Sequence, residues 1–106
     1  MAEHPSRSPL IRVALVTGAA QGIGEAIALQ LAQDGLDVAI NDIPSKKLQL
    51  EEVATAIEGK HRRALVVCGD ISSEDDVSSM VSKTVAELGG LDVVCHFPSV
   101  QSKYMS

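Results

Sequence analysis

The stretch Thr17-Gly-Ala-Ala-Gln-Gly-Ile-Gly24 decides the fold of this chain. It follows Arg12-Val-Ala-Leu-Val16, a short apolar run that is typical of a strand buried on both faces. It precedes residues 25–33, which are rich in strong helix formers. The three segments therefore predict a strand, a glycine-rich loop and a helix in succession.

Each glycine of this loop has a physical reason to be there. A turn from strand to helix can pass phosphate oxygens only where no Cβ stands in the way and N–H groups point at them. In this interpretation Gly18 lets the chain turn, Gly22 lets the backbone approach a pyrophosphate, and Gly24 lets the helix pack closely on the strand. Taken alone, the same glycines also suit a flexible turn, and that alternative stays open.

Length and composition limit the chain to one domain, because 106 residues can bury a single core. The net charge of −5 and the aromatic pair Phe97 and Tyr104 provide no basic or stacking surface for nucleic acid. No apolar run is long enough for a membrane helix, and residues 1–10 lack the apolar centre of a signal peptide. With Cys68 and Cys95 interpreted as thiols of a reducing compartment, these features favour a cytoplasmic protein.

Apolar spacing predicts the remaining elements in order. The expected strands are residues 12–16, 36–42, 64–68 and 91–96. The first helix has Ile23, Ile27 and Leu31 at one-turn spacing and stops at Gly35. Residues 1–10 are expected to be a disordered leader and residues 97–106 an irregular tail, because neither has a helical or strand period.

The second and third helices are predicted from their apolar faces. The second ends at Gly59, and its apolar face is Leu50, Val53, Ala54 and Ile57. The third is capped by Ser72 or Ser73, with Asp75 or Asp76 completing a capping box, and its apolar stripe is Val77, Met80, Val81, Val85 and Leu88. Between them, residues 61–63 are interpreted as a polar approach to a strand, with His61 in a surface turn. Lys46 and Lys47 are assigned to the solvated face of the second helix.

An acidic residue, Asp42, ends the second predicted strand 18 residues after Gly24. In a dinucleotide-binding unit, a carboxylate about 20 residues past the glycines accepts hydrogen bonds from the adenosine ribose. Asp42 would also repel a 2′-phosphate, since both groups are negatively charged. The alternative, an ordinary surface aspartate at a strand end, stays open.

Four motifs in order now carry a resemblance: Thr17-Gly-x-x-x-Gly-x-Gly24, Asp42, Gly69-Asp70-Ile71 and Gly89-Gly-Leu-Asp-Val-Val94. Over about residues 11–95 the chain resembles the short-chain dehydrogenase/reductase family, and it looks most like acetoin or diacetyl reductases. The resemblance implies an α/β, Rossmann-type three-layer fold, here a four-stranded parallel sheet of order 3-2-1-4 with three helices. Residues 11–96 would form the NAD-binding half-domain.

The resemblance also assigns roles to particular residues. Gly18, Gly22, Ile23 and Gly24 would line the cofactor phosphates, and Asp42 would bind the ribose. Asp70, together with the backbone of Ile71, would hold the adenine edge. The implied cofactor is NAD, with NADP less favoured because of Asp42. No metal site is expected, because no His or Cys pair has ligand spacing.

The chain departs from the family pattern after the fourth strand. Where members have Asn-Asn-Ala-Gly, this sequence has His96-Phe-Pro-Ser99. The family's catalytic serine and Tyr-x-x-x-Lys pair lie further along a longer chain, and Tyr104 cannot substitute because Lys103 precedes it. We therefore assign no catalytic residue and expect a truncated, inactive cofactor-binding half. The alternatives are a noncatalytic module that pairs with full-length relatives and a product without a function of its own.

Sheet handedness raises the question of self-association. Right-handed crossovers place two helices on one face of the sheet and one helix on the other. We expect much of the second face, and the edge of the fourth strand, to be bare. Self-association, or association with full-length relatives, would cover them.

Overall fold

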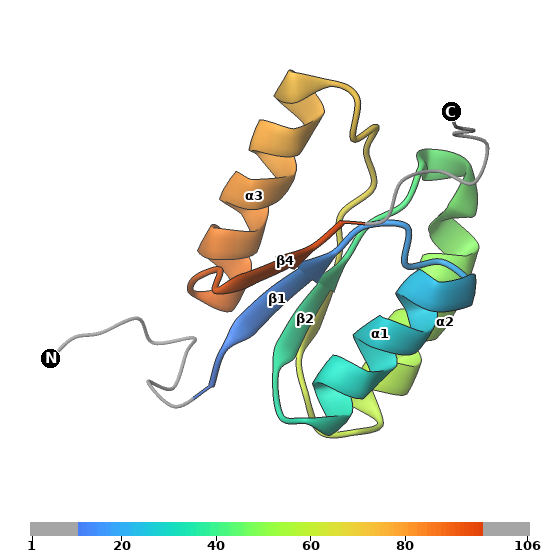
Figure 1. Cartoon of the computed structure of the whole chain (residues 1–106), viewed down its shortest axis with the longest axis vertical. Helices are drawn as coiled ribbons and strands as arrows, with labels where there is room; N and C mark the ends of the chain where they lie inside the picture. Colours follow the sequence, from blue (N-terminus) through green and yellow to red (C-terminus); the bar gives the residue numbers. More distant parts are fainter. Residues whose placement is uncertain (1–10, 97–106) are drawn as a thin grey trace, which may run out of the picture.

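The computed structural model describes residues 11–96, and the predictions for residues 1–10 and 97–106 lie outside this range. Figure 1 shows the elements in space. In chain order they are β1 (Val13–Val16), α1 (Gly22–Gln33), β2 (Asp37–Ile40), the 3₁₀ turn η1 (Pro44–Lys46), α2 (Lys47–Glu58), β3 (Ala64–Val66), α3 (Glu74–Leu88) and β4 (Val93–Cys95).

The four strands form one parallel sheet in the order β3-β2-β1-β4, as predicted. Helices α1 and α2 lie on one face and α3 lies on the other, which gives three layers (Figure 1). Right-handed crossovers account for this arrangement, because the chain moves outward from β1 to β3 and then returns across the sheet to β4.

A separate apolar cluster fills the space on each side of the sheet. Val38 and Ile40 of β2 are fully buried, as predicted, on the side of α1 and α2. On the side of α3, Val13 and Leu15 of β1 pack with Met80 and Leu88. β1 and β2 are thus buried on both faces, which explains the apolar runs Val13–Val16 and 38–40.

Helix α1 begins at Gly22, inside the glycine loop, and its buried face is made of small residues. Gly24, Ala28 and Ala32 face the core. Of the three residues predicted at one-turn spacing, Ile23 is 71% exposed, whereas Ile27 and Leu31 are half-buried and Leu31 packs against the core. Because small side chains allow a helix to approach a sheet closely, the size of the apolar residues predicted this face only in part.

Helix α3 covers more of its face than predicted. Leu15 and Ala39 of the central strands are 3% and 0% exposed, so the expectation of a largely bare face is wrong for β1 and β2. Exposure is concentrated on β4, at the edge of the described sheet, where Val94 is 57% exposed. On the helix itself, Thr84 is buried and Val85 is 40% exposed, which corrects the predicted stripe at this position.

A buried ion-pair cluster lies at the amino end of the sheet. Asp37 is 1% exposed, and its carboxylate accepts two hydrogen bonds of 3.0 Å, one from the backbone N–H of Arg63 and one from Nε of Arg63. Arg62 Nε lies 3.2 Å from the same carboxylate, as an ion pair without a hydrogen bond. The Arg63 guanidinium also donates to the carbonyl of Leu88 at 2.9 Å, at the end of α3. The prediction of a merely polar approach missed this cluster, whereas His61 does lie in an exposed turn, with a φ of 64°.

Candidate functional site

The predicted site residues gather at the carboxyl edge of the sheet. The chain leaves β1 toward β2 on one side, while β4 pairs with β1 on the other side. In open α/β sheets, a crevice for a ligand forms at such a switch point. The loop after β1, the residues after β2 and the residues after β3 all lie at this edge.

The glycine loop has the backbone that its sequence predicts. Gly18 and Gly22 both have a φ of 63°, in the left-handed region that favours glycine. A Cβ on Gly24 would stand only 2.1 Å from the carbonyl oxygen of Gly18. Close packing at Gly24 therefore brings α1 against the loop itself.

The space beside the loop suits an anion. A Cβ placed on Gly22 would meet no atom within 4 Å, so the backbone is open to an approaching group there. The residue before α1, Gln21, does not cap the helix with its side chain. The first N–H groups of a helix have no acceptor within the helix, and its N-terminus carries a partial positive charge. Open space and free donors are what a cofactor phosphate requires.

Asp42 lies next to this loop. One carboxylate oxygen, Oδ2, accepts from the backbone N–H of Ala20 at 3.2 Å, and the other, Oδ1, accepts from Ile43 at 2.9 Å. Each oxygen retains a further lone pair for a hydroxyl donor. The structure thus brings Asp42 together with Gly18, Gly22 and Gly24, as the sequence predicted.

Asp70 lies in the turn after β3, on the neighbouring part of the edge. Its Oδ1 accepts from the hydroxyl of Ser72 at 2.7 Å and from the backbone N–H of Ser72 at 2.8 Å. These bonds lower the pKa of Asp70 below its ordinary value, because they stabilise the carboxylate. The Asp70 side chain orders its own turn, and the role at an adenine edge stays a prediction.

The cap of α3 ties the same turn to the helix. Ser73, one of the two predicted caps, accepts from the N–H of Asp76 at 3.2 Å. The carboxylate of Asp76 accepts from the backbone of Asp70 at 2.8 Å rather than completing a box with Ser73. The turn at Asp70 is therefore held from both of its ends.

Asn41 joins the three segments of the site, and sequence reasoning missed it. It is 1% exposed, and its amide Nδ2 donates to the carbonyl of Val67 at 2.9 Å. Its backbone N–H donates to Val16, and its carbonyl accepts from Ala19 in the glycine loop, both at 2.8 Å. The signal available in the sequence was a polar residue at the end of a predicted buried strand, directly before the predicted ligand Asp42.

Two further polar contacts border the loop. Lys46 Nζ donates to Oε1 of Gln21 at 2.9 Å, so this lysine is not merely a solvated residue of the second helix. On the opposite side of β1, the hydroxyl of Thr17 lies 3.1 Å from Nδ1 of His96. His96 stands where the family pattern has asparagine, and it contacts the residue that opens the loop.

Metal ligation and membrane insertion find no support in the described part of the chain. Residues 11–96 contain no group of three or more His, Cys, Asp or Glu side chains arranged to hold a metal ion. Within the same range, no helix has both the length and the apolar character to cross a bilayer.

Curated relatives match most of this chain. The family model of the short chain dehydrogenases matches residues 12–103. A short-chain dehydrogenase/reductase of Armillaria gallica is 55% identical over 86 residues, which is 80% of this chain and 33% of the relative. L-2,3-butanediol dehydrogenase of Corynebacterium glutamicum is 39% identical over 83 residues, or 78% of this chain and 32% of the relative. The chain spans about a third of the length of these relatives.

Solved structures share the same arrangement. Hydroxysteroid dehydrogenase from Escherichia coli matches with a TM-score of 0.74 at 29% identity, over 80% of this chain and 35% of that one. A short-chain type dehydrogenase/reductase from Mycobacterium marinum matches with a TM-score of 0.73 at 37% identity. This match covers 78% of this chain and 32% of that one. With the sheet order, the glycine loop and these matches in agreement, the chain belongs to the short-chain dehydrogenase/reductase family.

Proposed function

We propose that residues 11–96 bind a nicotinamide dinucleotide and form the cofactor-binding part of a short-chain dehydrogenase/reductase. The observation that carries the proposal is the hydrogen bond from Ala20 to Asp42, which holds a carboxylate beside the open glycine loop. NAD(P) binding is a property of the family, and the preference for NAD over NADP is our proposal from Asp42.

Each part of the adenosine diphosphate has residues that would hold it. The backbone of Gly18, Gly22, Ile23 and Gly24 would donate to the phosphates, and Asp42 would accept from the ribose hydroxyls. The turn at Asp70 and Ile71 would lie along adenine. When bound, the nicotinamide ring supplies the hydride acceptor or donor of the reaction.

The 106 residues by themselves are proposed to lack turnover. They contain no Tyr-x-x-x-Lys pair, so the proton that accompanies hydride transfer has no assigned relay. The free thiols of Cys68 and Cys95 suit the reducing conditions of the cytoplasm.

ADP-ribose is expected to bind this chain about as tightly as NAD, because all the assigned contacts are to the adenosine diphosphate half. Isothermal calorimetry with both ligands measures the two dissociation constants. NAD binding at least roughly tenfold tighter, a difference of about 1.4 kcal/mol, would contradict the assignment. Failure of both ligands to bind would remove the proposed function altogether.

Asp42→Ala is expected to narrow the preference for NAD over NADP. The substitution removes an acceptor for the ribose hydroxyls, worth about 1.5–3 kcal/mol when charged, and also removes repulsion of a 2′-phosphate. Calorimetry with both cofactors gives the ratio of their affinities. Asp34→Ala is the matched control, because Asp34 is an exposed aspartate at the other end of α1. Equal affinity of the unmutated chain for NAD and NADP would refute the role of Asp42.

A further inference from the structure

We propose that Lys46 determines how far the site tolerates a phosphate on the adenosine 2′-hydroxyl, an inference that rests on the dinucleotide binding proposed above. Lys46 ends η1, in the segment that follows Asp42. Its Nζ reaches back across 25 residues of sequence to Gln21, at 2.9 Å. Gln21 follows Ala20, the residue whose N–H holds Asp42.

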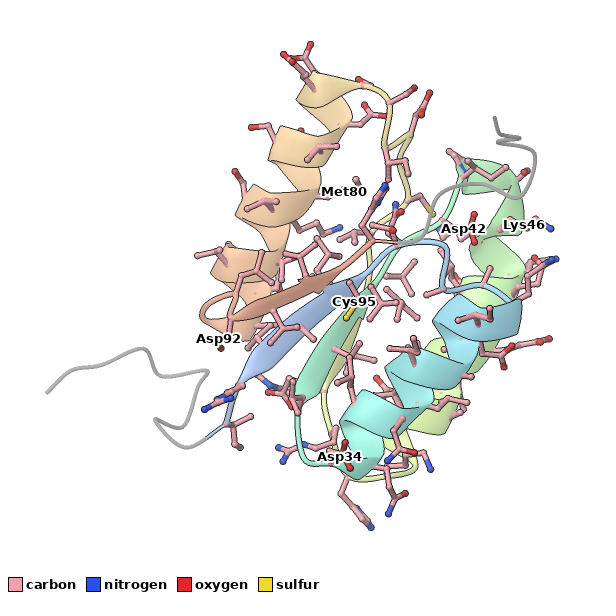
Figure 2. The ribbon with its side chains drawn as sticks, viewed as in Figure 1. Asp34, Asp42, Lys46, Met80, Asp92 and Cys95 are labelled. Atoms are coloured by element: carbon pink, nitrogen blue, oxygen red, sulfur yellow. The ribbon has the colours of Figure 1, made fainter. Side chains whose placement is uncertain are left out.

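The ammonium group and the Asp42 carboxylate therefore border the same stretch of the glycine loop. Figure 2 shows Lys46 and Asp42 on the α1–α2 side of the sheet, beside the start of α1. Of two successive loop residues, Ala20 donates its backbone N–H to Asp42, and Gln21 accepts from Lys46 through its side-chain oxygen. A ribose that donates to Asp42 would place its 2′-oxygen at this border.

Lys46 keeps its charge available for a ligand. Its hydrogen-bond partner is the neutral amide of Gln21. The ion pairs within residues 11–96 join Asp37 to Arg62 and Arg63, so none of them involves Lys46. Lys46 is half-buried, whereas the next residue, Lys47, is exposed. An ammonium makes a strong, charge-assisted hydrogen bond to phosphate. A lysine that is already positioned binds phosphate more favourably than a mobile surface lysine, because it loses less side-chain entropy on binding.

Two opposite charges thus act on the same ligand position. Asp42 accepts a hydrogen bond from a 2′-hydroxyl and repels a 2′-phosphate, whereas Lys46 attracts that phosphate. The site is expected to prefer NAD while retaining measurable affinity for NADP. Lys46 is therefore a specificity-determining residue that moderates the effect of Asp42.

The test compares two nucleotides that differ only in the group at issue, 5′-AMP and adenosine 2′,5′-bisphosphate. Lys46→Met retains an unbranched stem but removes the charge. NMR titration is expected to show binding of the bisphosphate weakened about three- to tenfold and binding of 5′-AMP changed by less than about twofold. Lys46→Arg, which restores a cation, should bring the bisphosphate within about twofold of the unmutated chain.

Lys60→Met is the matched control. Lys60 Nζ donates to Oε1 of Gln33 at 3.1 Å, so the same lysine–glutamine contact occurs at the other end of α1. This variant loses the same net charge and should leave both nucleotides unaffected. An equal effect of Lys46→Met on both nucleotides, no effect on either, or an effect reproduced by Lys60→Met overturns the inference while leaving dinucleotide binding intact. Failure of the unmutated chain to bind either nucleotide, NAD or ADP-ribose overturns both.

Discussion

Gly24→Ala is expected to abolish measurable nucleotide binding and to lower the free energy of unfolding by about 1–3 kcal/mol. The new Cβ would stand 2.1 Å from the carbonyl oxygen and 2.7 Å from the carbonyl carbon of Gly18. Both atoms belong to the backbone, so no side-chain rotation can relieve the overlap. Either α1 moves away from the sheet or the loop at Gly18 shifts, and both changes displace the N–H groups proposed to bind phosphate.

Two other glycines complete the series, with Gly59 as the control and Gly22 as a second position in the loop. Gly59→Ala should leave stability unchanged or raise it by about 0.4–1 kcal/mol, since φ is −64° and the nearest neighbour of the new Cβ, the carbonyl oxygen of Ala56, would be 3.4 Å away. Gly22→Ala meets open space but places a Cβ at a φ of 63°, which costs about 1–2 kcal/mol. Urea denaturation and ADP-ribose titration measure the series. A Gly24→Ala chain with unchanged midpoint and affinity would show that α1 does not need its close approach to the loop.

Asp37→Ala is expected to lower the free energy of unfolding by about 3–5 kcal/mol. The side chain of Asp37 is 2% exposed, and those of Arg62 and Arg63 are 23% and 39% exposed. Removing the carboxylate leaves two partly buried guanidinium groups without their anion. It also leaves the backbone N–H of Arg63 without its acceptor, and partial solvation of the arginines places the loss toward the lower end of the range.

Chemical denaturation with Asp34→Ala as the control isolates the buried pair. Asp34 is exposed and accepts from Gln30 at 3.0 Å, so its loss should change stability by no more than about 0.5 kcal/mol. Arg62→Ala should be milder than Arg63→Ala, because Arg63 makes the hydrogen bonds to Asp37 and also binds the end of α3. Equal midpoints for Asp37→Ala and Asp34→Ala would mean that the cluster contributes nothing to folding.

The sheet and the glycine loop could be predicted because their signals are local. β1 is a continuous apolar run and β2 is apolar after Asp37, and Gly18 and Gly22 have φ values that favour glycine. The strand order followed from the family resemblance, and the handedness of the crossovers then assigned each helix to a face of the sheet. The proximity of Asp42 to the loop was predicted from its spacing after the glycines together with the strand–loop–helix pattern.

The remaining features depend on partners that are distant in sequence. Asp37 meets Arg63 across 26 residues, Asn41 meets Val67 across 26, and Lys46 meets Gln21 across 25. A charged or amide residue looks the same in the sequence whether its side chain is solvated or paired. Only the tertiary structure distinguishes a solvated side chain from a paired one. The fully buried residues of α1 were missed for a related reason, since close packing selects Ala28 and Ala32 over larger apolar residues.

The pairing of β1 with β4 affects how the nascent chain folds during synthesis. The bond from the backbone N–H of Val13 to the carboxylate of Asp92 spans 79 residues, whereas β2, which fills the other edge of β1, follows directly after α1. At a synthesis rate of about 5–20 residues per second, β1 waits roughly 4–16 s for the strand that closes its second edge. During that interval a nascent chain exposes an apolar strand with unpaired amides, the kind of template that chaperones cover and that neighbouring chains on a polysome can capture.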